Sequence, residues 1–231
     1  MRLSPRLKML ADMVDDGAVV ADVGTDHAYL PLYLLSTGKC PSAVASDLRE
    51  GPLMNAVANA AASGLTDRIT MRISDGLDAV MPDDADCFIF AGMGGNLIVD
   101  ILSKADWICD GTKSFIFQPM THAETVRAYL LSLGFRIVKE NACFDECKPY
   151  IAFKAVYDPT YKRKYKKSYV WMGDLDKVGN DAAAYYLTKQ YTYLKKRADA
   201  LEFAKLLPDE VRAIREILPD IEPHIRKIRK D

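Results

Sequence analysis

The sequence predicts an α/β protein in which a mostly parallel sheet with an antiparallel edge strand precedes a small C-terminal α-helical coiled-coil domain. Short apolar runs alternate with helical segments through about the first 134 residues. Two further apolar runs then follow each other without an intervening helix. A heptad pattern begins near residue 184. These three patterns, read in chain order, give the expected architecture.

The expected strands of the parallel sheet are short runs rich in apolar residues. They are Ala18–Val23, Ser42–Asp47, Ile69–Ile73, Asp86–Ala91 and Ser114–Pro119. The expected helices are Tyr29–Thr37, Pro52–Ser63, Asn96–Lys104 and Glu124–Leu133. Strands that alternate with helices are typical of a parallel sheet with helices on both faces.

Two local signals suggest where helices begin, and one suggests how the sheet ends. Pro52 suits the first position of a helix. Thr121 and Glu124 have the spacing of a capping box. The apolar runs Phe135–Phe144 and Tyr150–Val156 predict an antiparallel pair at the sheet edge.

The composition changes at Tyr157, so we expect one domain over residues 1–156 and a second over 157–231. The second begins with a basic cluster made of Lys162, Arg163, Lys164, Lys166 and Lys167. Apolar residues then recur at alternating steps of three and four, at Ala184, Leu187, Tyr191, Leu194, Ala198 and Leu201. A similar pattern follows Pro208 and is interrupted by Pro219 and Pro223. A helical hairpin is expected, and its seam could close within one chain or between two, which allows a monomer or a weak dimer.

Charge is distributed unevenly along the 231 residues. Residues 1–155 contain 14 lysines and arginines and 20 acidic residues, whereas residues 156–231 contain 17 and 12. A basic tail on an acidic body suggests an anionic macromolecular partner, although a solvated helical surface explains the same charges. Tyr193 lies off the seam and is open to the same two interpretations.

Composition also argues against several classes of protein. The five cysteines are scattered and form no CxxC pair, so neither a disulfide framework nor a metal site is expected. No apolar run approaches the ~20 residues of a membrane span, and the N-terminus lacks the apolar segment of a signal peptide. We therefore expect a cytoplasmic protein without a membrane partner.

Glycines and carboxylates stand where the expected parallel strands end. The first strand leads into Asp22-Val23-Gly24-Thr25-Asp26-His27, and the second ends at Asp47. Asp75 and Gly76 follow the third strand, and Gly92-Met93-Gly94-Gly95 follows the fourth. Ligands of open α/β sheets bind beyond the carboxyl ends of the strands, so these residues predict a shared site.

The residue types favour a nucleoside cofactor that carries no phosphate. Asp47, which lies 23 residues after Gly24, can accept hydrogen bonds from both ribose hydroxyls of an adenosine. The loop after the first strand has one glycine and carries Asp26 where a dinucleotide would place its pyrophosphate. This loop argues against NAD and favours S-adenosylmethionine (SAM). The expected cofactor contacts are Asp22, Gly24, Thr25, His27, Asp47, Leu48, Asp75, Gly76, Gly92, Met93 and Gly94.

Several strings of residues resemble one known family. DVGTDHAYLP at residues 22–31, AGMGG at 91–95 and Gln118-Pro119 look like the bacterial tRNA (adenine-N1)-methyltransferases that modify position 22 in the D-loop. The resemblance implies a Rossmann-like, SAM-dependent methyltransferase domain with a helical coiled-coil domain after it. It also implies methyl transfer to N1 of adenine. One departure is Met120, where that family often has asparagine.

The resemblance assigns roles to residues around the expected site. Asp26 is the candidate catalytic carboxylate, although it could instead cap the following helix. Tyr29, Gln118 and Pro119 are candidate contacts to the acceptor base, and the basic cluster at residues 162–167 is a candidate contact to tRNA phosphates. His27 could contact the cofactor or simply be packed. Two alternatives remain: a SAM enzyme that acts on a protein or small molecule, and a non-catalytic RNA-binding module.

Overall fold

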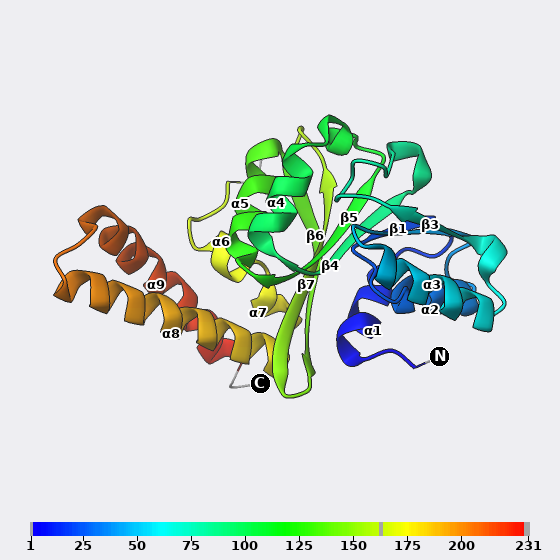
Figure 1. The fold of residues 1–231 in the computed structure, drawn as a ribbon. Coiled ribbons are helices and arrows are strands. Elements are labelled where there is room, and N and C mark those ends of the chain that lie inside the picture. The colour runs from blue at the N-terminus through cyan, green and yellow to red at the C-terminus, as the bar shows by residue number, and fades with distance from the viewer. Residues whose placement is uncertain (1, 162–163, 229–231) are drawn as a thin grey trace. The chain divides into compact units, whose positions relative to one another are not determined.

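The computed structural model describes residues 2–161 and 164–228. Seven strands form one sheet in the order β3-β2-β1-β4-β5-β7-β6 (Figure 1). The strands are β1 Val20–Val23, β2 Ala43–Asp47, β3 Ile69–Ile73, β4 Cys87–Gly94, β5 Ser114–Thr121, β6 Phe135–Asp145 and β7 Lys148–Tyr157. The first five pair in parallel, and β7 pairs antiparallel with β5. The expected sheet, including its antiparallel edge, is confirmed.

The helices between strands pack in two groups. The helices of the first part are α1 Pro5–Ala11, α2 Tyr29–Ser36, α3 Glu50–Ala62, α4 Gly95–Ser103 and α5 Ala123–Leu133. Strand order reverses at β1, because β2 and β3 lie on one side of it and β4 and β5 on the other. Right-handed crossovers therefore put α2 and α3 on one face of the sheet and α4 and α5 on the other, as Figure 1 shows.

Stacked phenylalanines hold the centre of the sheet. Phe88 of β4 lies opposite Phe115 of β5, and Phe90 lies opposite Phe117 in the next pair. The ring centroids of these two pairs are 5.6 and 5.4 Å apart, and Phe117 also lies 5.5 Å from Phe153 of β7. All five side chains are fully buried. Aromatic cross-strand pairs stabilise a sheet beyond the area they bury, so they fix the register of the strands that carry the site.

Two expected helix starts are wrong. Pro52 is the third residue of α3, which begins at Glu50. Thr121 is the last residue of β5 and does not cap α5; His122 precedes that helix with a φ of 52° and makes no capping bond through its side chain. The carboxylate of Glu124 instead lies 3.1 Å from the ring nitrogen Nδ1 of His122. The spacing of Thr121 and Glu124 suits a capping box, but β5 continues through Thr121, so this residue is part of the sheet and does not begin the helix.

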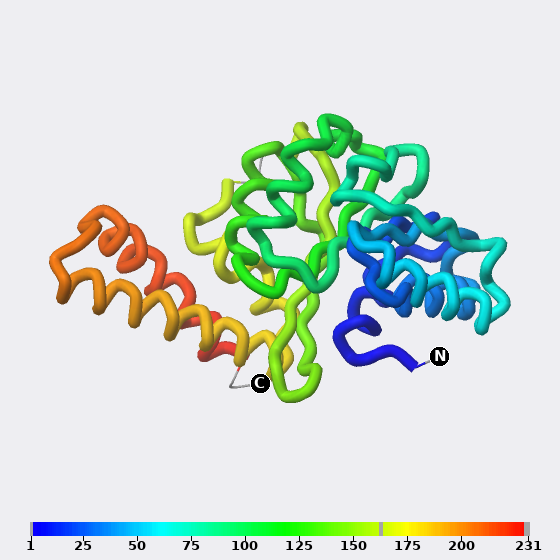
Figure 2. Tube along the Cα trace, viewed as in Figure 1, coloured from blue at the N-terminus to red at the C-terminus, as the bar shows by residue number. Residues whose placement is uncertain are grey.

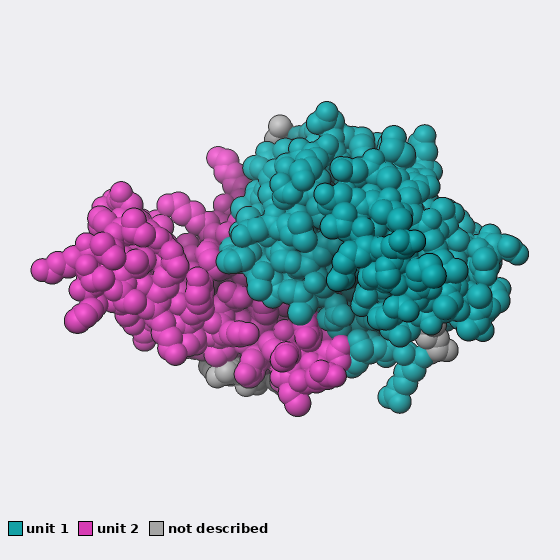
Figure 3. Space-filling model, viewed as in Figure 1, with its two compact units in different colours: residues 1–139, 152–162 teal, residues 140–151, 163–231 magenta. Residues whose placement is uncertain are grey.

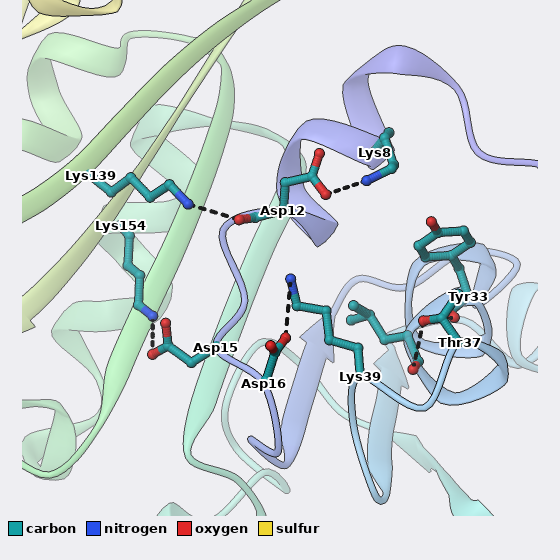
Figure 4. Close-up of polar contacts among 10 residues, drawn as sticks. Lys8, Asp12, Asp15, Asp16, Tyr33, Thr37, Lys39, Lys139 and Lys154 are labelled. Carbon is teal, nitrogen blue, oxygen red and sulfur yellow. Dashed lines mark hydrogen bonds and ion pairs between the residues drawn. The ribbon is translucent and has the colours of Figure 1, made fainter.

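Polar contacts attach α1 and the loop after it to the rest of the sheet (Figure 4). The ammonium group of Lys139 donates a 2.8 Å hydrogen bond to the carbonyl oxygen of Asp12. The buried Lys154 of β7 pairs with Asp15. Asp16 also lies in the loop after α1, and its Oδ1 is 3.8 Å from the Nζ atom of Lys39, which follows α2. These contacts fix the position of α1 on the sheet.

The chain forms two compact units (Figure 3). The first comprises residues 1–139 and 152–162, and the second comprises residues 140–151 and 163–231. Figure 2 shows β6 and β7 running side by side. The turn between them lies at Glu146 and Cys147. The distal half of this hairpin therefore belongs to the second unit. The expected boundary after residue 156 stays a prediction, because compactness does not test independent folding.

The second unit contains the helical hairpin. Its helices are α6 Tyr169–Met172, α7 Leu175–Val178, α8 Asp181–Phe203 and α9 Pro208–Ile228. Ala184, Leu187, Leu194 and Ala198 are buried along α8 at the expected seam, while Tyr191 and Leu201 are half-buried. Pro219 and Pro223 lie inside α9, which continues through both of them because its apolar face is buried at six isoleucine and leucine positions. Among the described residues, no helix is both long and apolar enough to cross a membrane.

Gly95 sits where α4 packs closely on the end of β5. A Cβ atom at this position would lie 2.2 Å from the carbonyl oxygen of His122 and 2.7 Å from that of Thr121. We expect Gly95→Ala to lower the free energy of unfolding by about 1–3 kcal/mol, because backbone atoms must move. Urea denaturation measures the change.

The matched control is Gly51→Ala. Gly51 lies in α3, and a Cβ there would meet no atom within 4 Å. Alanine is favoured over glycine inside a helix, so this variant should gain about 0.5–1 kcal/mol. Equal effects of the two substitutions would show that the close packing at Gly95 contributes nothing.

Candidate functional site

A cavity of about 470 Å³ opens in the first unit at the carboxyl ends of β1, β2 and β4. This is the point at which the strand order reverses, where ligands of open α/β sheets bind. Its volume is typical of small-molecule sites. The expected residues that line it are Asp22, Gly24, Thr25, Asp26, His27, Tyr29, Asp47, Leu48, Asp75, Gly76, Gly92 and Met93.

The loop after β1 bends back over the end of β2. The backbone N–H groups of Gly24 and Thr25 both donate 2.8 Å hydrogen bonds to the carbonyl oxygen of Ser46. Gly24 has a φ of +74°, and a Cβ there would lie 2.3 Å from the terminal methyl of Met93. Glycine at this position therefore serves the backbone conformation, whereas the Met93 methyl is the end of a flexible side chain that can move.

Asp26 lies in this loop with its carboxylate largely exposed. It adopts a φ of 55°, and its side chain is 65% exposed. The alternative role of Asp26 as a helix cap is wrong, because Ala28 precedes α2 and no side chain caps that helix. The carboxylate is thus available at the cavity wall, 3.7 Å from the Nε2 atom of His27.

Asp47 is held with its carboxylate facing the loop. It is 8% exposed at the end of β2. Its Oδ1 accepts a 3.0 Å hydrogen bond from the backbone N–H of Arg49, and its Oδ2 accepts a 3.4 Å bond from that of Asp26. A carboxylate can accept about four hydrogen bonds, so both oxygens retain capacity for a ligand.

Asp22 is a buried carboxylate below the same loop. The pKa of Asp22 is raised to about 6, mainly by burial; the hydrogen bond from the Thr25 hydroxyl and the charge of Arg6 oppose this increase, and the charge of Asp47 adds to it. The Thr25 Oγ1 to Asp22 Oδ2 distance is 2.6 Å. The group is therefore ionised at neutral pH but at a cost, which a cationic ligand nearby would offset.

Aromatic rings lie beside the mouth of the cavity. The rings of His27 and Tyr29 stack with centroids 5.3 Å apart, and Tyr29 is 45% exposed. Asn59 donates a 3.0 Å hydrogen bond to the carbonyl oxygen of His27. His27 is therefore packed and also lines the cavity.

No cluster of potential metal ligands occurs among the described residues.

Gln118 and Pro119 lie behind the cavity and do not line it. Gln118 is fully buried; its Oε1 accepts hydrogen bonds from Arg6 Nη1 at 2.7 Å and from the backbone N–H of Gly92 at 3.1 Å. Gly92 is the extra residue of a bulge in β4, opposite the Gln118–Pro119 step of β5. Gln118 thus fixes the floor of the cavity. Gly94 also lies outside the lining and precedes α4.

The basic cluster belongs to the second unit or lies outside the described residues. Lys162 and Arg163 are outside the described residues. Lys164 is exposed. Lys166 pairs with Asp220 at 2.8 Å, and Lys167 pairs with Glu216 at 2.9 Å.

The cavity includes residues that the sequence did not reveal. They are Arg6, Leu7, Val23, Leu30, Arg49, Ser74, Ala91, Leu97 and Ile101. Arg6 and Leu7 come from α1, whose start carried a readable signal: Ser4 caps the helix and Pro5 is its first residue. Nothing in the sequence indicated that this helix would reach the ends of β4 and β5.

The raised pKa of Asp22 predicts a pH-dependent effect of Asp22→Asn. The folded state binds the proton more tightly than an ordinary carboxyl with a pKa of 3.8, so stabilisation by protonation is complete below that pH and lost as pH rises through about 6. The variant should therefore have a free energy of unfolding about 1–3 kcal/mol higher than wild type at pH 7.5, and this difference should narrow toward pH 4. The exposed Asp67→Asn is the control, and a gap independent of pH would contradict the assignment.

The comparison with known sequences places the chain in a family. Residues 3–153 match a family model described as a methyltransferase domain. The tRNA (adenine(22)-N(1))-methyltransferase of Bacillus subtilis is 36% identical over 150 residues, which cover 65% of this chain and 63% of that relative. The matched segment thus spans less than two thirds of the curated relative.

Solved structures match almost the whole chain. The B. subtilis m1A22 tRNA methyltransferase TrmK superposes with a TM-score of 0.83 and 28% identity, covering 98% of each chain. A Streptococcus pneumoniae protein assigned to the tRNA (m1A22) methyltransferases, solved with S-adenosyl-L-methionine, gives a TM-score of 0.80 and 34% identity over 94% of this chain and all of that one. The chain therefore belongs to the methyltransferase domain family, in the group of the bacterial tRNA (adenine(22)-N1)-methyltransferases.

Proposed function

We propose that this protein transfers a methyl group from SAM to N1 of an adenine in the tRNA D-loop, at position 22. The observation that carries the proposal is one cavity that gathers Asp22, Asp47 and an open glycine floor at the switch point of the sheet. The relative of known structure from S. pneumoniae was solved with SAM. A tRNA substrate implies action in the cytoplasm, and we propose that the chain acts there as a monomer or weak dimer.

The cavity fits SAM in its hydrogen-bond acceptors, its charge and its space. Asp47 retains acceptor capacity for two ribose hydroxyls. Asp22 supplies a negative charge that suits the positive sulfonium and amino groups. A Cβ at Gly92 would come no closer than 3.5 Å to a neighbouring atom, which leaves the floor open. When bound, SAM supplies an electrophilic methyl group.

The chain's own residues then hold the base and the charge that develops on it. N1 of neutral adenine already has a lone pair, and methylation makes the base cationic. The Asp26 carboxylate stands at the cavity wall and can stabilise that charge or accept a proton from N6. The exposed ring of Tyr29, backed by His27, offers a surface on which the base can stack. N1 lies on the pairing edge, so the base must leave its place in the tRNA.

The basic residues of the second unit extend the proposal to tRNA. Lys164, Lys166 and Lys167, with Lys162 and Arg163 outside the described residues, would contact phosphates. Lys166 and Lys167 already pair with carboxylates of α9, so phosphate contact there requires exchange of partners. Gln118 is fully buried and its Oε1 is held by Arg6 and Gly92, so direct contact with the base would require that the residues covering it move.

One assay separates this function from its alternatives. The protein is incubated with labelled SAM and total bacterial tRNA, and the modified nucleoside is mapped. We expect 1-methyladenosine at position 22 of the D-loop. Label in protein or small molecules but not in tRNA would indicate a different methyltransferase. Absence of transfer despite binding of SAM and tRNA would indicate a non-catalytic module.

Substitution of Asp26 tests the catalytic role. We expect Asp26→Ala to lower kcat by about 10²–10⁴-fold, which is the usual contribution of a positioned acid–base or charge-stabilising group. Its dissociation constants for SAM and tRNA should stay within about twofold of wild type, because the side chain is exposed and caps no helix. The exposed Asp67→Ala should retain full turnover. If Asp26→Ala also retained it, Asp26 would not be the catalytic group.

A further inference from the structure

Aromatic and lysine side chains alternate along the outward side of α8. Tyr185, Lys189, Tyr193, Lys196 and Phe203 follow one another at steps of four, four, three and seven residues. These steps keep all five close to one face of a helix with 3.6 residues per turn. We call these five residues the α8 stripe. From its first to its last residue it extends about 27 Å, at 1.5 Å per residue.

The side chains of the stripe face solvent. Tyr185 is 53% exposed, Tyr193 is 48% exposed and Phe203 is 92% exposed, and both lysines are exposed. The opposite face of α8 carries the buried seam with α9. The aromatic rings are therefore not part of the hydrophobic core of the hairpin, and their exposure leaves apolar surface in water.

The lysines of the stripe differ from most other cations of the second unit. Those other cations are held by carboxylates in the pairs Lys166–Asp220, Lys167–Glu216, Lys177–Asp174, Arg197–Glu210, Arg212–Asp209, Arg215–Asp199, Arg226–Glu222 and Lys227–Asp176. Within the described parts of the chain, neither Lys189 nor Lys196 has a carboxylate oxygen within 4 Å. Asp199, at the edge of the stripe, is bound by Arg215 at 2.7 Å. The positive charge of the stripe is not neutralised.

One of the rings, that of Tyr185, is also held in position. Phe144, from the distal part of the β6–β7 hairpin, contacts Tyr185 edge-to-face with centroids 5.8 Å apart. Rings that are held before a partner arrives lose less conformational entropy on binding.

We infer that the α8 stripe is an RNA-binding surface, on which the tyrosines and phenylalanine stack on unpaired bases while the lysines contact phosphates. The inference rests on the proposed function, which supplies tRNA as the RNA. Phosphates complement unpaired lysines, and every base has a face on which an aromatic ring can stack. A second copy of α8 fits less well, because the stripe contains no carboxylate to pair with the two lysines of a copy, and Asp199 at its edge is already bound by Arg215. The stripe thus adds a contact surface to the basic cluster at residues 162–167.

Removal of the two lysines tests the phosphate contacts. We expect Lys189→Ala combined with Lys196→Ala to weaken tRNA binding about tenfold at moderate salt and to reduce the slope of log Kd against log salt by about 2. The control is Arg212→Ala combined with Arg226→Ala. It removes the same charge from similarly exposed positions, 72% and 71%, that already pair within α9. An unchanged slope in the lysine variant, or equal losses in both variants, would overturn the inference.

Substitution of the tyrosines tests the stacking. Tyr185→Ala combined with Tyr193→Ala should weaken tRNA binding about tenfold without changing the salt slope, whereas the two Tyr→Phe changes should retain affinity. Circular dichroism and the affinity for SAM should be unchanged in every variant. Loss of self-association in place of tRNA affinity would make the stripe an interface between copies and overturn the inference.

The outcomes separate this inference from the proposed function. If wild type methylates tRNA and the stripe variants bind tRNA as wild type does, the stripe inference fails alone. If wild type neither binds nor methylates tRNA, the proposed function fails, and the stripe inference fails with it.

Discussion

The position of β1 between two parallel neighbours is the constraint on which the site depends. β1 pairs with β2 on one side and with β4 on the other. The strands before β4 therefore extend the sheet in one direction from β1, and β4 and the strands after it extend the sheet in the other. Right-handed crossovers then place α2 and α3 on one face of the sheet and α4 and α5 on the other. The loops that follow β1 and β4 are thereby separated, and the space between them becomes the cavity. The carboxylates that line the cavity lie at the carboxyl ends of β1, β2 and β3 or in the loops directly after them, and this arrangement aligns those strands.

The same arrangement makes the site electrostatically costly before a ligand arrives. Asp22 and Asp47 are both buried, and burial together with the nearby charge of Asp47 raises the pKa of Asp22. Thr25, Arg6 and backbone N–H groups offset part of that cost. A ligand with positive charge and hydroxyl donors completes the compensation. The preference for such a ligand over an anionic one thus follows from the protein's own unbalanced charge.

Sequence reasoning succeeded where the signal was local and failed where it depended on tertiary contacts. The strands and the residues at their carboxyl ends could be predicted, because apolar runs and glycine–carboxylate strings lie within a few neighbouring residues. Arg6 could not be predicted, since it meets Gln118 across 112 positions of sequence. Thr121 misled for the reverse reason: its spacing to Glu124 suited a cap, but pairing with Gly94 extended the strand. Which lysines of the tail carry free charge also depended on the fold, because the partners of Lys166 and Lys167 lie about 50 residues away.

The β6–β7 hairpin is shared between the two compact units, and this has a consequence for how such a protein can evolve. The chain passes between the units three times, after residues 139, 151 and 162. Within the second unit, Asn180 binds the carbonyl oxygen of Ala142, and Glu140 binds the backbone of Asp174. The helical unit is therefore not a simple appendage. A recombination that joined it to another sheet would need to bring the hairpin with it, so the two parts are expected to be inherited together.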